Sequence, residues 1–282
     1  MSEREAVPMA APEPGSHNLA VRVVAALVLA PLTIAMAYAG GLFWTALVTL
    51  VAIGLFLEWL TVVSAARAIR VTVSGSVALA IAGWYLAAGQ INVSLAALAV
   101  GFAAVALLSP ERRGWSAAGF FYAAAALVAS VLVRLDPDEG LVALIFVLLV
   151  VWVTDIGGYF AGRGIGGPKL WPRVSPKKTW AGALGGFAGS LVIAAGFAAF
   201  GLGKPLPLLL LAAILSVASQ LGDLFESAVK RRFGVKDSSH IIPGHGGLLD
   251  RLDGFVAAIV LAALFGFLRG GIDGVGRALM VW

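Results

Sequence analysis

Carboxylates, basic side chains and glycines gather in two stretches of the second half of this sequence. The first stretch, residues 155–180, contains the run Ser-Pro-Lys-Lys-Thr-Trp at 175–180. The second stretch, residues 219–253, ends in the run Pro-Gly-His-Gly-Gly-Leu-Leu-Asp-Arg-Leu-Asp at 243–253. Acidic groups that hold a cation, basic groups and flexible glycines can together bind a polyphosphate and stabilise charge on it. The two stretches therefore predict a polyphosphate-binding site.

Three aspartates in the second stretch are the candidate metal ligands. Asp223 lies at the end of an otherwise uncharged segment. Asp250 and Asp253 stand three residues apart, so a helix that continued into the next apolar segment would present both on one face. Carboxylates at such depth in a membrane are costly unless they are paired, hydrated or bound to a cation. We expect Mg²⁺ here, held by one or two carboxylates and by substrate phosphates.

Purely structural ion pairs are the alternative for the same charges. Glu226 and Lys230 stand at helical spacing and would pair, and Asp250 or Asp253 would pair with Arg251. The choice between ion pairs and a metal site stays undecided at this point, because a carboxylate that is paired with a lysine has less capacity to bind a metal cation.

The lysines of the first stretch also allow two interpretations. Lys177 and Lys178 precede the start of a helix, where backbone N–H groups help to bind phosphate. They would equally anchor the chain to anionic lipid headgroups. His245, which lies between two glycines, is either a general base or a structural or phosphate hydrogen-bond donor.

Two familiar nucleotide motifs do not account for these stretches. Residues 162–167 satisfy G-x-G-x-x-G, but no Asp or Glu occurs from residue 156 to residue 222, whereas a dinucleotide fold places an acidic residue about 20 positions after the motif. No P-loop pattern is present in the sequence.

The composition shows what must position these residues. Of the 282 residues, 60% are hydrophobic and 12% are charged, and the mean hydropathy is +0.97. A water-soluble globule is excluded, because so few charges cannot cover so much apolar surface. The absence of cysteine excludes disulfides and thiolate metal sites. We interpret the net charge of +5 as a membrane-topology signal, with no nucleic-acid partner.

Uncharged intervals predict an all-α membrane protein with nine spanning helices. Two spans fit between Arg22 and Glu58 and two between Arg70 and Glu111; single spans fit at about 114–133, 140–160, 181–203, 205–224 and 254–270. With nine alternating spans, four of the 20 basic residues fall on one side, and the other 16 share the opposite side. Cytoplasmic loops collect Lys and Arg, so the N-terminus is expected in the cytoplasm. The four exceptions are Arg134, Lys204, Arg269 and Arg277.

Three regions follow from this pattern. Residues 1–17 are expected to be a disordered tail, residues 18–140 a transmembrane scaffold of about five helices, and residues 141–282 a catalytic region of about four helices with two cytoplasmic loops. Glu58, the lone charge in the scaffold's membrane segments, is expected near a helix end. The many alanines and glycines favour close helix packing through small residues.

The polar runs resemble those of the CDP-diacylglycerol synthases, also called phosphatidate cytidylyltransferases. The segment from Ser227 to Asp253 resembles that family's signature throughout, and the runs at 175–180 and 220–223 resemble further family elements. The likeness is strong over the C-terminal half, whereas residues 1–140 share only hydropathy. It implies that phosphatidic acid attacks the α-phosphorus of CTP, which gives CDP-diacylglycerol and pyrophosphate.

The resemblance also implies roles for individual residues. The metal ligands would be Asp223 and Asp250, with Asp253 close by, and Asp155 would orient the first loop or assist the metal. Phosphates of CTP or of the lipid would contact Lys230, Arg231, Lys236 and Arg251. Further substrate-binding candidates are Ser175, Lys177, Lys178, Thr179, Ser227, Asp237, His245, Gly246 and Gly247.

The same resemblance implies the partners and the location. CTP would arrive from the cytoplasm and the lipid from the inner membrane, with Mg²⁺ and, as an open alternative, a second metal or a monovalent cation. A homodimer is suggested by the resemblance alone.

Two other function classes remain as alternatives. A CDP-alcohol phosphotransferase also uses metal-bound aspartates, but its pattern, D-G-x-x-A-R followed by G-x-x-x-D-x-x-x-D, is not found here. A transporter would place its charges near the bilayer midplane. In this sequence they gather at one membrane face, which favours chemistry on a lipid headgroup.

Overall fold

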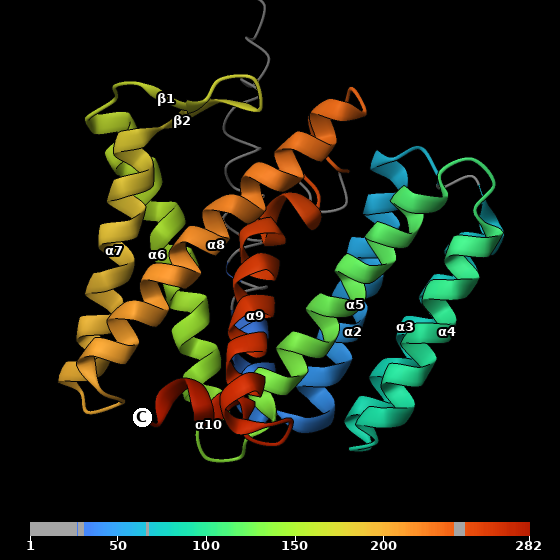
Figure 1. Ribbon diagram of the computed structural model, residues 1–282, viewed down its shortest axis with the longest axis horizontal. Coiled ribbons are helices and arrows are strands. Elements are labelled where there is room, and N and C mark those ends of the chain that lie inside the picture. Colours follow the sequence, from blue (N-terminus) through green and yellow to red (C-terminus); the bar gives the residue numbers. More distant parts are fainter. Residues whose placement is uncertain (1–26, 28–30, 66–67, 240–245) are drawn as a thin grey trace, which may run out of the picture.

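In the part of the chain that the structure describes, eight long helices alternate in direction (Figure 1). The computed structural model describes residue 27 and residues 31–65, 68–239 and 246–282. Each of the eight helices is long and apolar enough to cross a membrane. They are α2 (Gly41–Val62), α3 (Ile69–Ala87), α4 (Ile91–Leu108), α5 (Arg113–Leu135), α6 (Gly140–Gly164), α7 (Trp180–Ala199), α8 (Pro205–Arg232) and α9 (Leu249–Gly270).

These helices confirm the predicted polytopic all-α class and eight of the nine predicted spans. Residue 27 and residues 31–39, in the first predicted span, are also helical, and the other residues of that span before residue 31 lie outside the described residues. The predicted tail at 1–17 lies outside them as well. A short helix that was not predicted, α10 (Val275–Met280), closes the chain.

Two helices extend beyond the apolar segments that predicted them. α8 continues past residue 224 to Arg232, and α9 begins at Leu249 instead of near residue 254. Charged residues occupy both extensions, and Glu226 and Lys230 form an ion pair one helical turn apart. Hydropathy marks the part of a helix that crosses lipid, whereas backbone hydrogen bonding continues where polar side chains find partners.

The first polar stretch contains a β-hairpin where a loop was expected. Strand β1 (Lys169–Trp171) pairs antiparallel with β2 (Ser175–Thr179). Thr179 then caps α7, because its Oγ1 accepts a hydrogen bond from Gly182 N at 3.1 Å. The hairpin therefore connects the end of α6 directly to the start of α7.

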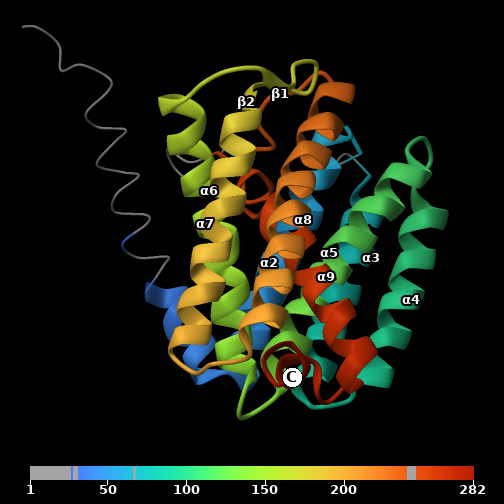
Figure 2. The ribbon, with the colours of Figure 1, turned by 60° about the vertical axis from the view of Figure 1, so that its left-hand side comes forward.

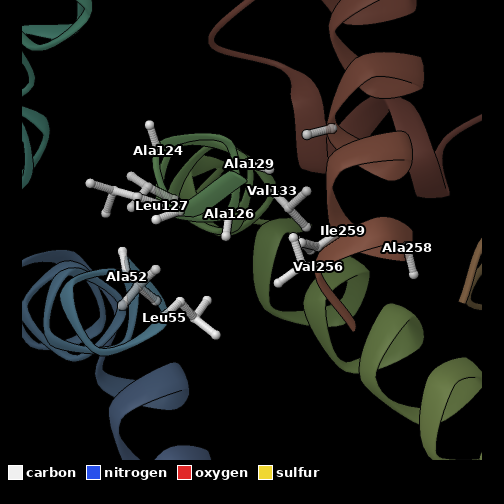
Figure 3. Packing of buried hydrophobic residues seen from close by; sticks show 14 of the residues in the cluster. Ala52, Leu55, Ala124, Ala126, Leu127, Ala129, Val133, Val256, Ala258 and Ile259 are labelled. Carbon is white, nitrogen blue, oxygen red and sulfur yellow. The ribbon is translucent and has the colours of Figure 1, made fainter. Parts of the chain in front are cut away.

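Small side chains bring the central helices together. α5 packs against α2 on one side and α9 on the other, and Figure 3 shows the alanines, valines and leucines that meet there. Lipid supplies no hydrophobic driving force between helices, so close van der Waals packing stabilises such contacts. The expected packing through small residues is present at these interfaces.

α6 and α7 come closer still, because glycines face each other across their interface. A methyl group built on Gly186 would lie 2.3 Å from Thr154 O, and one built on Gly182 would lie 2.7 Å from Gly158 O. No side chain larger than hydrogen fits at these positions unless the helices separate. Backbone therefore approaches backbone directly at these two positions.

The two polar stretches lie at the same end of the bundle (Figures 1 and 2). We call it the polar end: it comprises the hairpin, the C-terminal turns of α6 and α8, and the first turn of α9. The four basic residues assigned to the other side of the membrane lie on α5, α9 and α10 and just before α8, at the opposite end of the bundle. The two membrane faces predicted from charge thus correspond to the two ends of the bundle.

Candidate active site

Lys230 lies at the centre of the candidate site and contacts two acidic groups. Its Nζ lies 2.7 Å from Glu226 Oε2 and 2.5 Å from Asp250 Oδ1. The three side chains are 11%, 2% and 12% exposed, so this ion-pair triad is largely withdrawn from water. The predicted pairing of Glu226 with Lys230 is confirmed, and Asp250 shares the same ammonium group.

The carboxylate of Asp250 receives hydrogen bonds on both oxygens. Oδ1 accepts from Lys230 Nζ, and Oδ2 lies 3.0 Å from Ser238 N, from Ser238 Oγ and from Gly247 N. A carboxylate offers about four lone-pair sites, so these donors occupy most of its capacity. Asp250 is thereby fixed in direction at the start of α9.

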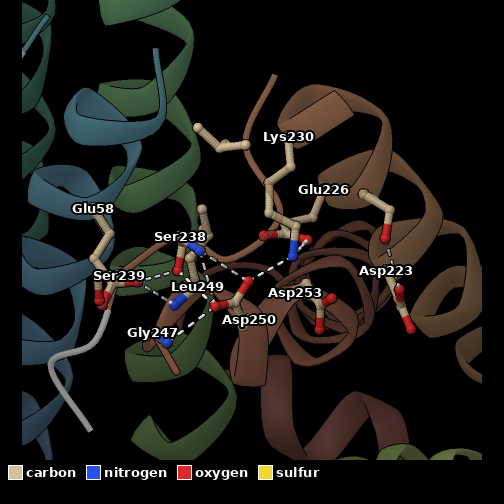
Figure 4. A network of polar contacts seen from close by, with 12 residues as sticks. Glu58, Asp223, Glu226, Lys230, Ser238, Ser239, Gly247, Leu249, Asp250 and Asp253 are labelled. Carbon is tan, nitrogen blue, oxygen red and sulfur yellow. Dashed lines mark hydrogen bonds and ion pairs between the residues drawn. The ribbon is translucent and has the colours of Figure 1, made fainter. Parts of the chain in front are cut away.

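A second buried carboxylate, Glu58 of α2, lies next to Asp250 (Figure 4). Its two oxygens accept hydrogen bonds from Ser238 Oγ at 2.9 Å and Ser239 Oγ at 2.6 Å. They also accept from the backbone N–H groups of Leu248 at 2.8 Å and Leu249 at 2.7 Å. Glu58 of α2 thus contacts both described parts of the signature segment, at residues 238–239 and at residues 248–249.

Gly247 shows how tightly this network is packed. A methyl group built on it would lie 1.9 Å from Ser238 Oγ and 2.6 Å from Glu58 Oε2. Glycine is required here by this close approach, which explains one of the glycines that the sequence places before Asp250.

Asp223 and the hairpin form the other part of the site. Lys178 Nζ of β2 forms an ion pair with Asp223 Oδ2, and both side chains are about one-third exposed, at 29% and 31%. Ser227 Oγ donates to Asp223 Oδ1 at 3.4 Å. The structure therefore brings the two polar stretches together through a lysine and an aspartate that were both predicted to act.

Asp253 lies between the two groups of charges in Figure 4. Its Oδ1 accepts from Gly254 N at 2.8 Å. The like charges of Asp223, Glu226 and Asp155 act on it electrostatically. Tyr122 OH and Ser219 Oγ are two of the four buried hydroxyls that have no hydrogen-bond partner within the described ranges. Tyr122 is near enough to Asp253 to feel its charge.

This donor set suits a cation that takes only part of its coordination from protein. Among the described residues, no group of three or more His, Cys, Asp or Glu side chains is close enough to enclose a metal ion. Mg²⁺ usually takes one or two carboxylates and completes its shell with water and substrate phosphates. Asp223 and Asp253, whose like charges interact, are two carboxylates that could hold such an ion.

The remaining predicted residues line the polar end. Arg231, Lys236, Asp237 and Arg251 are exposed around the triad, as is Lys177 on the hairpin. Arg231 Nη1 donates to Val235 O at 3.2 Å. The others are placed as follows: Asp155 is exposed on α6, Ser175 is half-buried on β2, Thr179 caps α7, Gly246 has a positive φ of 84° before α9, and His245 lies outside the described residues.

Sequence reasoning missed the role of Glu58. It expected this residue near a helix end, where it does lie, four residues before the end of α2, but it assigned the residue to a scaffold without site contacts. The signal was present, since a single carboxylate in a long uncharged segment requires buried partners. What the sequence did not reveal was that these partners lie 180 and 191 positions away, at Ser238 and Leu249.

Comparisons with known proteins cover both halves of the chain. The model of the cytidylyltransferase family matches residues 20–268. The phosphatidate cytidylyltransferase of Brucella suis is 43% identical over 256 residues, which is 88% of this chain and 93% of that protein. The phosphatidate cytidylyltransferase of Bacillus subtilis is 50% identical over 123 residues, or 42% of this chain and 44% of that protein. The matches therefore include α2 as well as the polar stretches.

Proposed function

This chain belongs to the cytidylyltransferase family, and we propose that it transfers CMP from CTP to phosphatidic acid, giving CDP-diacylglycerol and pyrophosphate. The observation that carries the proposal is the gathering of Lys178, Asp223, Lys230 and Asp250 at one end of a membrane bundle. Ammonium groups can bind phosphates, and the carboxylates beside them can balance the charge of a bound cation. A lipid headgroup reaches such a site at the membrane surface.

The transfer requires alignment more than proton chemistry. A phosphate oxygen of phosphatidic acid forms a bond to the α-phosphorus of CTP, the bond from that phosphorus to the bridging oxygen breaks, and the electron pair leaves with pyrophosphate. The attacking phosphate is already anionic, so the chain need not supply a strong base. Lys178 and Lys230 are held where they can bind phosphate oxygens, and the exposed Arg231, Lys236 and Arg251 attract both substrates to this face.

We propose Asp223 and Asp253 as ligands of Mg²⁺. Asp250, the other predicted ligand, would reach the same ion only if the carboxylates moved closer together, because the described residues hold no group of three acidic side chains close enough to share one ion. Bound there, Mg²⁺ would neutralise charge on the phosphates of CTP. The unpartnered Tyr122 OH and Ser219 Oγ support a polar ligand or hydrated cation in this region. The open alternative, a second metal ion or a monovalent cation, would use the same carboxylate and hydroxyl oxygens.

The protein is a multi-pass membrane protein, and we place its polar end in the cytoplasm at the inner membrane. The support for this orientation is the distribution of basic residues between the two ends of the bundle. CTP would then approach from the aqueous side, and the acyl chains would remain in the bilayer. A homodimer is an additional proposal that rests on the family resemblance.

The decisive experiment is an assay of purified protein with phosphatidic acid, CTP and Mg²⁺. It measures the release of pyrophosphate and the formation of labelled CDP-diacylglycerol. A parallel reaction with CDP-diacylglycerol and an alcohol tests the phosphotransferase alternative. Product in the first reaction alone supports the proposal. Product in the second reaction alone, or ion flux into vesicles without any product, refutes it.

Asp223→Asn should abolish Mg²⁺-dependent turnover while the protein stays folded. The ion pair with Lys178 is partly exposed, so its loss should change the free energy of unfolding by no more than about 1 kcal/mol. The matched control is Asp273→Asn, which removes an exposed aspartate after α9, at the opposite end of the bundle. Near-normal turnover by folded Asp223→Asn protein would remove Asp223 from the proposed metal site.

A further inference from the structure

Glu58 is a buried carboxylate that accepts hydrogen bonds from four donors among the described residues, all of them neutral. Its residue is 1% exposed, and the donors are two serine hydroxyls and two backbone N–H groups, at 2.6–2.9 Å. A buried carboxylate is costly unless it is well hydrogen-bonded, and these four donors supply that compensation. The same bonds fix the position of every group that donates to it.

Two of these donors belong to the start of α9. The N-cap residue of that helix, Leu248, offers no side-chain cap. Glu58 supplies the missing acceptor from another helix, because it binds the N–H groups of Leu248 and Leu249. A negative charge is favourable at a helix N-terminus, where the peptide dipoles point their positive end. α2 therefore caps α9.

The capped residues come directly before Asp250. Ser238 connects the two carboxylates, since its Oγ lies 2.9 Å from Glu58 Oε2 and 3.0 Å from Asp250 Oδ2. A hydroxyl has one proton, so it serves one carboxylate at a time, while Ser238 N donates to Asp250 independently. Two backbone N–H groups donate to Asp250, those of Ser238 and Gly247. Ser238 itself donates to Glu58 through its hydroxyl, and Gly247 directly precedes Leu248, whose N–H donates to Glu58.

The packing on α2 is consistent with this arrangement. Gly54 lies one helical turn before Glu58, and a methyl group built on it would lie 2.9 Å from Leu248 Cδ2. Gly54 and Gly247 together let the start of α9 approach α2 closely enough for the hydrogen bonds to Glu58.

We infer that Glu58 is a positioning residue for the proposed nucleotidyl transfer: it caps α9 from α2 and holds Asp250 in its orientation toward Lys230. This inference rests on the proposed function for its effect on turnover, but the capping itself is independent of that function. Glu58 touches neither substrate nor the reacting atoms, and it acts through Ser238 and the backbone of residues 247–249.

Glu58→Gln tests the inference, because glutamine keeps the shape but turns an NH₂ group toward N–H donors. We expect hydrogen exchange in the peptide covering 246–253 to accelerate, while the hairpin peptide at 169–179 is unchanged. We expect kcat to fall about 10- to 100-fold, with the KM for CTP within about two-fold, because misplacing Asp250 affects the reacting geometry more than nucleotide binding.

Thr45→Val is the matched control. It removes a different, part-buried hydrogen bond on α2, the one from Thr45 Oγ1 to Gly41 O at 2.9 Å, at the far end of the helix. If Thr45→Val lowers stability as much as Glu58→Gln and lowers kcat equally, the role of Glu58 is merely structural and the inference is overturned.

Ser238→Ala keeps the test decisive if Glu58→Gln does not fold. This variant removes the shared hydroxyl but keeps the N–H bond to Asp250, so it should accelerate exchange at 246–253 and lower kcat less than Glu58→Gln. Unchanged exchange and kcat in both variants, or in Ser238→Ala alone when Glu58→Gln does not fold, would refute the inference. If the wild-type protein shows no turnover of CTP, the proposed function fails, and the exchange rates alone decide whether Glu58 caps α9.

Discussion

Replacing Lys230 by methionine would leave two buried carboxylates without the cation that they share. Methionine keeps an apolar stem of similar length, so the change removes charge more than volume. Glu226 and Asp250 lie 2.7 Å and 2.5 Å from Lys230 Nζ, with side chains only 2% and 12% exposed. Breaking a buried ion pair by removing one partner costs about 3–5 kcal/mol. We expect a loss of that size in the free energy of unfolding.

The two carboxylates should not contribute equally to this loss. Asp250 keeps hydrogen bonds from Ser238 and Gly247 when the ammonium is gone. Among the described residues, Lys230 is the only group that compensates Glu226. Adding Glu226→Gln to Lys230→Met should therefore recover a large part of the lost stability, whereas adding Asp250→Asn should recover less.

Reversible unfolding in mixed micelles, followed by circular dichroism, measures these differences. Lys236→Met is the control, because it removes an exposed lysine from the same end of the bundle and should change the free energy of unfolding by no more than about 0.5 kcal/mol. A loss below about 1 kcal/mol in Lys230→Met would refute the account of the triad. Equal recovery by the two second-site changes would refute the proposed asymmetry.

Two further predictions concern the helices that carry the hairpin, and thermal unfolding measures both. Gly186→Ala should destabilise the protein by about 1–3 kcal/mol, because the new methyl group meets Thr154 O. Gly196→Ala, on the same helix with open space around it, should instead stabilise it by about 0.5–1 kcal/mol. Thr179→Val should cost about 1 kcal/mol through loss of the cap on Gly182 N, and Thr179→Ser should not. If Gly186→Ala and Gly196→Ala changed stability equally, the close contact of Gly186 with Thr154 O would be contradicted. Equal effects of Thr179→Val and Thr179→Ser would contradict the cap on Gly182 N.

The sequence was most informative where long-range partners were not needed. Hydropathy located the spans because lipid forces each crossing segment to satisfy its own backbone hydrogen bonds. Spacing along one helix predicted that Glu226 would pair with Lys230, since residues four apart share a face. The placement of basic residues predicted which helix ends share the polar end of the bundle.

It was less informative where a contact depends on how helices pack. No local pattern indicates that Lys178 reaches Asp223, or that Asp250 takes the same lysine as Glu226. Glu58 shows the same limit, because its donors come from a segment on the other side of the chain's midpoint. The hairpin at 169–179 was expected to be a loop, since its three- and five-residue strands are too short to give a clear alternating pattern.

The backbone contact between α6 and α7 also constrains how this enzyme can move. Because α7 packs directly on the backbone of α6 at Gly182 and Gly186, we expect α6, the hairpin and α7 to move together. At the polar end, the partly exposed ion pair of Lys178 with Asp223 joins that body to α8, and such a pair contributes about 1 kcal/mol or less. A displacement of this body away from α8 would therefore break that ion pair at the polar end and, deeper in the bundle, the buried hydrogen bond from Thr154 Oγ1 to Ser216 Oγ at 2.9 Å.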